Sequence, residues 1–130
     1  MPIHIGWHGN SQRIIKIRIV GDWDVADFIT TLENSATMMR HVSHPVHILY
    51  NFDDSTATPR DFLAGLHFAN RILPTNQGIV VYIGANSVIK AFILMAKRTG
   101  LPASKYIYNA DSREQAYQIM VEQGHRVYTI

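Results

Sequence analysis

The sequence contains no cysteine, so the chain can form no disulfide and offers no thiolate for catalysis. It also lacks any apolar run near the roughly 20 residues that a membrane-spanning helix needs, because the longest candidate, residues 88–96, is far shorter. The opening residues, MPIHIGWHG, do not show the basic and then apolar segments of a secretory signal. These absences predict a cytoplasmic protein without a membrane anchor.

The sequence also lacks a large excess of charge of either sign. Its formal net charge is only +2, and the basic residues are scattered along the chain. A nucleic-acid surface needs clustered basic residues, so we expect no nucleic-acid partner. Hydrophobic residues, in contrast, make up 47% of the sequence, which is a globular composition. At 130 residues a single domain spanning residues 1–130 is the simplest organisation.

Hydrophobic periodicity predicts the secondary structure. Residues 3–7 and 15–19 alternate apolar and polar side chains around a turn signal, HGNS, which indicates an antiparallel hairpin. A helical stripe follows over residues 25–39, capped by Asp22 or Asp24. Residues 46–52, 79–83 and 106–108 read as strands, and the residues after each of them lead into a helix. We expect the last helix to end at Gly124, and residues 125–130 to form a terminal strand or a tail.

The centre of this organisation is residues 44–73, which read as strand, polar loop and helix. Thr58 can cap that helix, Pro59 suits its first position, and Asp61 fits a capping box. The element order predicts an α/β domain: a mixed, mostly parallel five-stranded sheet with an N-terminal antiparallel strand pair and four helices. The central strand should be residues 79–83 or 46–50. The predicted buried residues are Phe28, Leu32, Ile48, Leu66, Ile83, Ile93 and Ile119.

This layout resembles the STAS domain, which sulphate transporters and anti-sigma factor antagonists share. The resemblance covers most of the chain and rests on the opening strand pair, on the GDWD sequence at residues 21–24, and on the strand-to-helix join at residues 53–61. In the antagonists this join has an Asp-Ser-Ser-Gly-like sequence, and phosphorylation of a serine there by a partner kinase controls binding. Here Asp54 and Ser55 match the Asp-Ser pair, but the serine and glycine after them are absent.

The loop at residues 51–58 is the first candidate site. Ser55, Thr56 or Thr58 could accept a phosphate, which the free N–H groups of a helix N-terminus would stabilise. Alternatively, Thr58 is a helix cap and the others are turn residues. We expect Asp54, Ser55 and Thr58 to line the functional surface in either case.

The second candidate site combines three strand-to-helix junctions, at residues 51–55, 84–87 and 109–112, which should lie on one edge of the sheet. With Asn86 and Ser87 at the second junction, these segments could hold a small anion or a nucleotide. The alternative is that Asn86 and Asp111 only cap helices. No dinucleotide-binding or Walker motif is present.

Other polar clusters give weaker signals. His41, His44 and His47 span a helix end, a proline and a strand, so we expect divergent side chains and no metal site. No serine lies in a nucleophile-elbow sequence. Trp7 and Trp23 lie beside turn residues and are the aromatic residues that we expect at the surface.

The resulting hypothesis is a non-enzymatic regulatory or protein-binding domain without a cofactor, with a protein partner and a homodimeric state. The alternative hypothesis is a small-ligand or nucleotide-binding module that uses the strand-to-helix junctions. The homodimer is expected because the opening hairpin and residues 125–130 are strand-like pieces at the chain ends, and unpaired strand edges attract partners.

Overall fold

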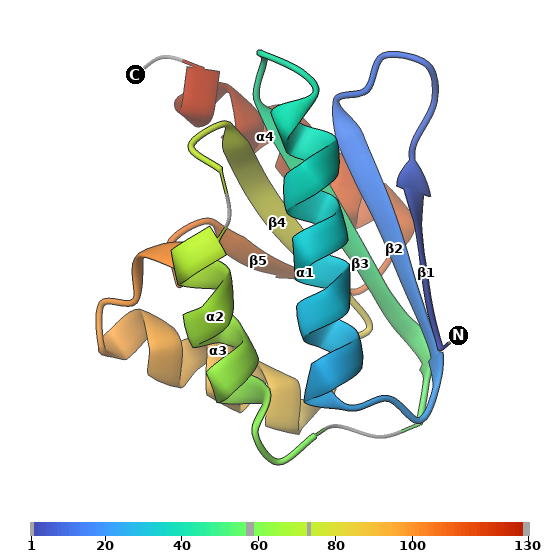
Figure 1. Cartoon of the computed structure of the whole chain (residues 1–130), viewed down its shortest axis with the longest axis vertical. Coiled ribbons are helices and arrows are strands. Elements are labelled where there is room, and N and C mark those ends of the chain that lie inside the picture. Colours follow the sequence, from blue (N-terminus) through green and yellow to red (C-terminus); the bar gives the residue numbers. More distant parts are fainter. Residues whose placement is uncertain (1, 57–58, 73, 129–130) are drawn as a thin grey trace.

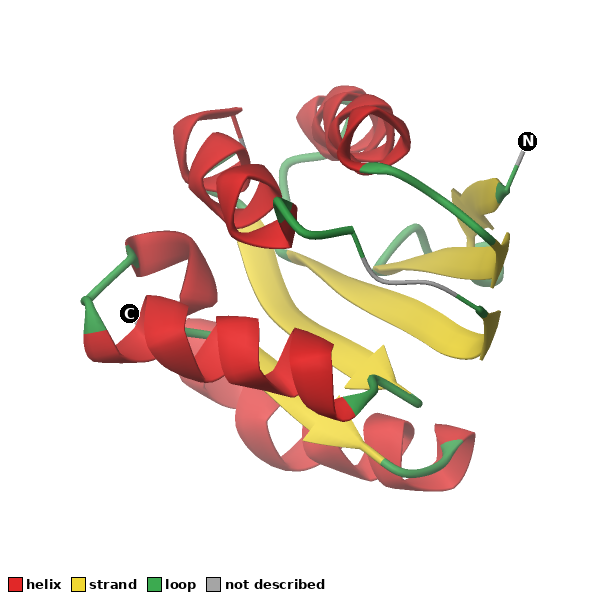
Figure 2. Ribbon diagram, turned by 90° about the horizontal axis from the view of Figure 1, so that it is seen from below, coloured by secondary structure: helices red, strands yellow, loops and turns green. Residues whose placement is uncertain are grey.

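The computed structural model describes residues 2–56, 59–72 and 74–128. Its elements, in chain order, are β1 (Ile3–Trp7), β2 (Ile14–Gly21), α1 (Val25–Arg40), β3 (Val46–Ser55), α2 (Phe62–Ile72), β4 (Gln77–Ile83), α3 (Ser87–Arg98), a short 3₁₀ helix η1 (Pro102–Ser104), β5 (Ile107–Ala110) and α4 (Arg113–Tyr128). Figure 1 shows helices in front of the sheet and α4 behind it, and Figure 2 shows the sheet between these two layers. None of the described helices is long and apolar enough to span a membrane.

The strands form one five-stranded sheet in the order β1-β2-β3-β4-β5. β1 and β2 are antiparallel, whereas all the other pairs are parallel, so the predicted fold class is confirmed. β3 is the middle strand, as predicted for one of the two candidate segments.

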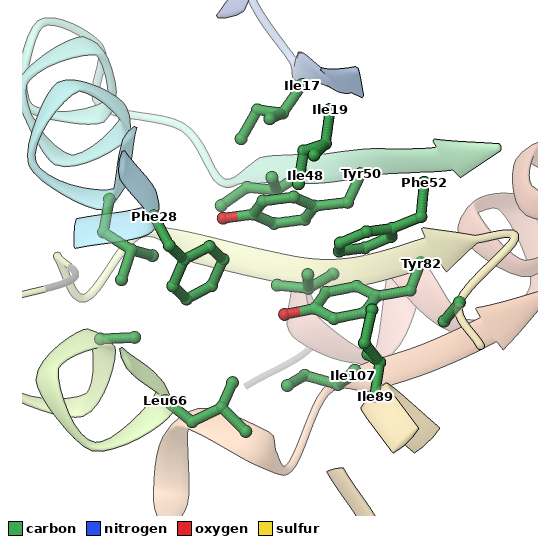
Figure 3. Close-up of a cluster of buried hydrophobic side chains, with 14 of the residues drawn as sticks. Ile17, Ile19, Phe28, Ile48, Tyr50, Phe52, Leu66, Tyr82, Ile89 and Ile107 are labelled. Atoms are coloured by element: carbon green, nitrogen blue, oxygen red, sulfur yellow. The ribbon is translucent and has the colours of Figure 1, made fainter. Parts of the chain in front are cut away.

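The front face of the sheet, which we define as the side of α1, α2 and α3, carries the larger core. Tyr50, Phe52 and Tyr82 lie side by side on it, with 5.0 Å between the ring centroids of Tyr50 and Tyr82. Figure 3 shows these rings together with Phe28 of α1 and Leu66 of α2. The back face, the side of α4, carries a second core that includes Leu49, Val81, Ile83, Ala116 and Met120.

Most of the predicted core is confirmed. The predicted residues that are buried are Phe28, Leu32, Ile48, Leu66, Ile83 and Ile93. Ile119 is only partly buried, because it lies at the margin of the back-face core. Trp23 was expected at the surface, but it is 6% exposed. Its indole packs among aromatic rings of the front face, with 5.8 Å between the centroids of Trp23 and Phe62.

Two predicted boundaries are wrong. β3 continues through Asp53, Asp54 and Ser55, which were expected in a loop, because β2 extends alongside and pairs Gly21 with Ser55. The helix α2 then begins at Phe62 rather than at Pro59, and the Phe62 N–H donates to the Pro59 carbonyl at 3.3 Å. Thr58, the expected cap, lies outside the described residues.

The C-terminal prediction is also wrong over the described part of the chain. α4 passes through Gly124 and continues to Tyr128, so residues 125–128 form neither a strand nor a tail. One glycine within a helix costs about 1 kcal/mol, which did not suffice to end this helix. Residues 129–130 lie outside the described residues.

Candidate functional site

The carboxyl ends of β3, β4 and β5 lie toward one edge of the sheet, as predicted, although residues 51–55 belong to β3 rather than to a junction. β3, β4 and β5 are parallel, and the register pairs Asn51 with Ile83 and Ile83 with Ala110. Gly84, the first residue after β4, donates its N–H to the Ala110 carbonyl at 3.3 Å. Gly84 is also in close contact with Asp53, because a β-carbon placed on it would overlap the Asp53 carboxylate.

Ser55 is held at the end of β3 by Trp23. The Trp23 indole Nε1–H donates to Ser55 Oγ at 2.8 Å, so a buried side chain on the front face contacts a half-buried hydroxyl. Just beyond β3, Thr56 Oγ1 donates to Asp22 Oδ1 at 2.6 Å, and the Thr56 N–H donates to the Gly21 carbonyl at 3.0 Å. The GDWD sequence therefore fixes the end of β3 as well as leading into α1.

Asp54 forms an ion pair with Arg18 of β2. Arg18 Nη2 and Nε lie 2.7 Å and 3.1 Å from Asp54 Oδ2. The two side chains are 60% and 52% exposed, so water screens the pair and its contribution to stability is about 0–1 kcal/mol. The pair fixes the position of charge more than it stabilises the fold.

Asn86 acts as a helix cap, which was the alternative to ligand binding for this residue. Its Oδ1 accepts a hydrogen bond from the Ile89 N–H at 2.9 Å, and Ser87 is the exposed first residue of α3. Asp54 and Ser55 bond to β2 and Trp23, whereas Asn86 bonds within α3. The candidate residues thus form two groups along one edge of the sheet.

The side chains of His41, His44 and His47 contact different parts of the chain, as predicted. The His41 and His44 Nδ1–H groups donate to the carbonyls of Thr37 and Pro45, at 2.8 Å and 3.0 Å. His47 is buried and accepts from the Ile79 N–H on Nδ1 at 3.0 Å. Burial, followed by the charge of Arg13, lowers the pKa of His47, in keeping with the acceptor role of its Nδ1. In the part of the chain that the structure describes, no three His, Asp or Glu side chains group as a metal site would require.

Two solved structures are similar to this arrangement. The Bacillus cell fate determinant SpoIIAA in its phosphorylated form aligns at 12% identity with a TM-score of 0.54, covering 88% of this chain and 97% of that one. The anti-sigma factor antagonist SpoIIAA in its unphosphorylated form aligns at 12% identity with a TM-score of 0.50, covering 92% and 98%. The chain has a STAS-like fold. Its sequence matches no family model and no curated protein.

Sequence reasoning missed two residues that shape this edge of the STAS-like domain. Arg18 lies 36 positions before Asp54 in the sequence, and only the pairing of β2 with β3 brings the two together. Trp23 was assigned to the surface because polar residues flank it. The alternation of β2 did place Arg18 on a polar face, which was the available signal.

Proposed function

We propose that this STAS-like domain is a non-enzymatic regulatory module that binds a protein partner through the end of β3. The contact surface comprises Asp54 and Ser55, with Thr58, Asn86 and Ser87 as its further members. The observation that carries the proposal is the environment of Ser55: a half-buried hydroxyl held by Trp23, next to an exposed Arg18–Asp54 pair. SpoIIAA, which has a similar fold, is an anti-sigma factor antagonist with a phosphorylated form, and this supports a regulatory role.

A negative charge at Ser55 should change this surface. A phosphate there would displace the Trp23 N–H, meet the carboxylate of Asp54 and compete with it for Arg18. Phosphorylation is therefore expected to rearrange the end of β3 rather than to lock it in place. Ser55→Glu introduces part of this charge, and Ser55→Ala removes the hydroxyl alone.

The test compares partner capture from an extract of the native host by the wild type, Ser55→Glu and Ser55→Ala. Ser55→Ala leaves the buried Trp23 N–H without this acceptor, at a cost of about 1–3 kcal/mol. Trp23→Phe is the matched control, because it removes the same hydrogen bond from the buried side and leaves Ser55 in place. Ser43→Glu adds the same charge at an exposed turn.

The proposal requires that Ser55→Glu lose a partner protein that the Trp23→Phe and Ser43→Glu controls still capture. If Trp23→Phe loses the partner to the same extent, the effect is one of stability. If Ser55→Glu and Ser55→Ala both bind as the wild type does, the end of β3 is only a connector.

A second candidate function is a small-ligand or nucleotide-binding module at the strand-to-helix junctions. The convergence of the carboxyl ends of β3, β4 and β5 favours it, because ligands of open α/β sheets bind at such edges. A thermal-shift screen over nucleotides and anions tests it. A ligand at 100 times its dissociation constant should add about 2.7 kcal/mol of stability. No shift with any compound would remove this candidate.

We further propose a homodimer in the cytoplasm. The described part of residues 125–130 is helical and offers no strand edge, so of the two expected chain-end pieces only the opening hairpin remains, and its strand β1 lies at one edge of the sheet. Sedimentation at micromolar concentration measures the state. A dimer that persists in an Ile5→Pro variant, which removes a backbone donor from the open edge of β1, would exclude pairing through this strand.

A further inference from the structure

The back face of the sheet carries a hollow beside α4. It measures about 250 Å³ and lies over β1, β2 and β3, next to the first turn of α4. The antiparallel register places His4 opposite Arg18 and Gly6 opposite Lys16. These residues alternate with Ile3, Ile17 and Ile19 of the front-face core, so their side chains project from the back. α4 packs mainly against β4 and little against β1 and β2, which leaves this part of the back face open.

The lining of the hollow is basic. His4, Lys16, Arg18 and Arg113 reach it from three different elements, and no aspartate or glutamate lines it. Arg18 forms its ion pair with Asp54, whereas Lys16 and Arg113 form no ion pair with any residue that the structure describes. Cationic groups that converge on one space without carboxylates favour an anion there.

The floor of the hollow is apolar. Leu49 and Ile83 line it from β3 and β4, and both belong to the back-face core. Outside the lining residues, the hairpin and α4 are joined by a contact between the His8 and Tyr117 rings, whose centroids lie 5.5 Å apart. A small hollow with an apolar floor and a few convergent polar groups is the usual form of a ligand site.

Gly6 keeps the hollow open. A β-carbon placed on Gly6 would meet no atom within 4 Å, and its backbone does not require glycine by a positive φ. A larger side chain at this position therefore projects into free space, where it would occupy the volume without disturbing the packing around it.

We propose that this hollow binds a small organic anion: a carboxylate or a phosphate attached to a compact apolar group. The anionic end lies among Lys16, Arg18 and Arg113, and the apolar part lies on Leu49 and Ile83. The hollow lies next to the protein-binding surface proposed above, because Arg18, which lines the hollow, forms an ion pair with Asp54 of that surface.

The test titrates the full chain with phenyl phosphate, benzoate, inorganic phosphate and the uncharged benzyl alcohol, with amide NMR shifts as the readout. Phenyl phosphate or benzoate should bind at least tenfold more tightly than benzyl alcohol and inorganic phosphate. The stronger of the two aromatic anions identifies the preferred head group. The shifts should cluster on β1, β2 and the start of α4.

Three variants locate the binding. Lys16→Gln and Arg113→Gln should each weaken it at least tenfold, whereas Lys90→Gln, an exposed charge on α3, should leave it unchanged. Gly6→Val should abolish it and leave the unfolding midpoint equal to or above that of the wild type. No saturable binding of either aromatic anion at millimolar concentration would overturn the proposal. Unchanged binding in Gly6→Val, or equal weakening in Lys90→Gln, would also overturn it.

Discussion

Gly84, at the turn from β4 to α3, should not tolerate a side chain. Its φ of 71° lies in the left-handed region. A β-carbon there would overlap Asp53 Oδ1 and lie 3.2 Å from the Asp53 backbone nitrogen. The left-handed conformation costs an alanine about 1–2 kcal/mol, of which about 0.4–1 is offset by restriction of the unfolded chain. Overpacking adds about 1–3 kcal/mol. We therefore expect Gly84→Ala to lower the free energy of unfolding by about 2–4 kcal/mol.

Gly100 offers a matched control for this prediction. Its φ is 75°, and a β-carbon on it would meet no atom within 4 Å. Gly100→Ala should therefore incur the conformational cost alone, about 1 kcal/mol or less. Urea unfolding at an unchanged m-value measures both losses. If the two variants lose the same stability, the contact between Gly84 and Asp53 contributes nothing and our account of this junction is refuted. An Asp53→Ala background should narrow the difference if the account holds.

Further predictions concern the core and the pH dependence. Leu66→Ala, at a side chain that is 2% exposed, should cost about 2–5 kcal/mol in urea unfolding, and a loss below about 0.5 kcal/mol would show that the inner face of α2 is misassigned. Stability should fall as the pH drops below about 6.5, because the lowered pKa of His47 means that the unfolded chain binds its proton first. Above that pH both states hold the ring neutral and this contribution is constant. His47→Asn should flatten the slope below pH 6.5 relative to the wild type; an unchanged slope would show that other groups cause it.

The order and type of the elements could be predicted because local patterns determine them. The alternation of apolar and polar residues around the first turn predicted the β1–β2 hairpin, and the apolar runs predicted β3 and β4. Parallel pairing then followed from the alternation of strands and helices. The meeting of the strand-to-helix junctions was predictable for the same reason, since parallel strands end at a common edge.

The errors arose where distant parts of the chain decide the structure. Asp53 and Asp54 are turn-forming residues, yet the extended end of β2 supplies strand partners that override this preference. Trp23 is flanked by two aspartates, but its ring fills the space among Phe28, Phe52 and Phe62. The hollow on the back face could not be predicted either, because the sequence does not tell how far α4 extends across the sheet.

The two faces of the sheet differ in a way that bears on function. On the front face, three helices cover a continuous aromatic core. The hydrogen bond from Trp23 to Ser55 connects this core to the end of β3. On the back face, α4 alone covers the sheet, and the charged side of β2 next to it stays accessible. Placing a charged side chain on such an accessible face costs little free energy, whereas burying it in a sealed core costs a great deal.

Arg18 projects from this back face and reaches Asp54 at the end of β3, so one exposed side chain connects the hollow with the candidate protein-binding surface. An anion that draws Arg18 toward the hollow would weaken its pair with Asp54 next to Ser55. The partner surface proposed at β3 should therefore respond to what the hollow holds.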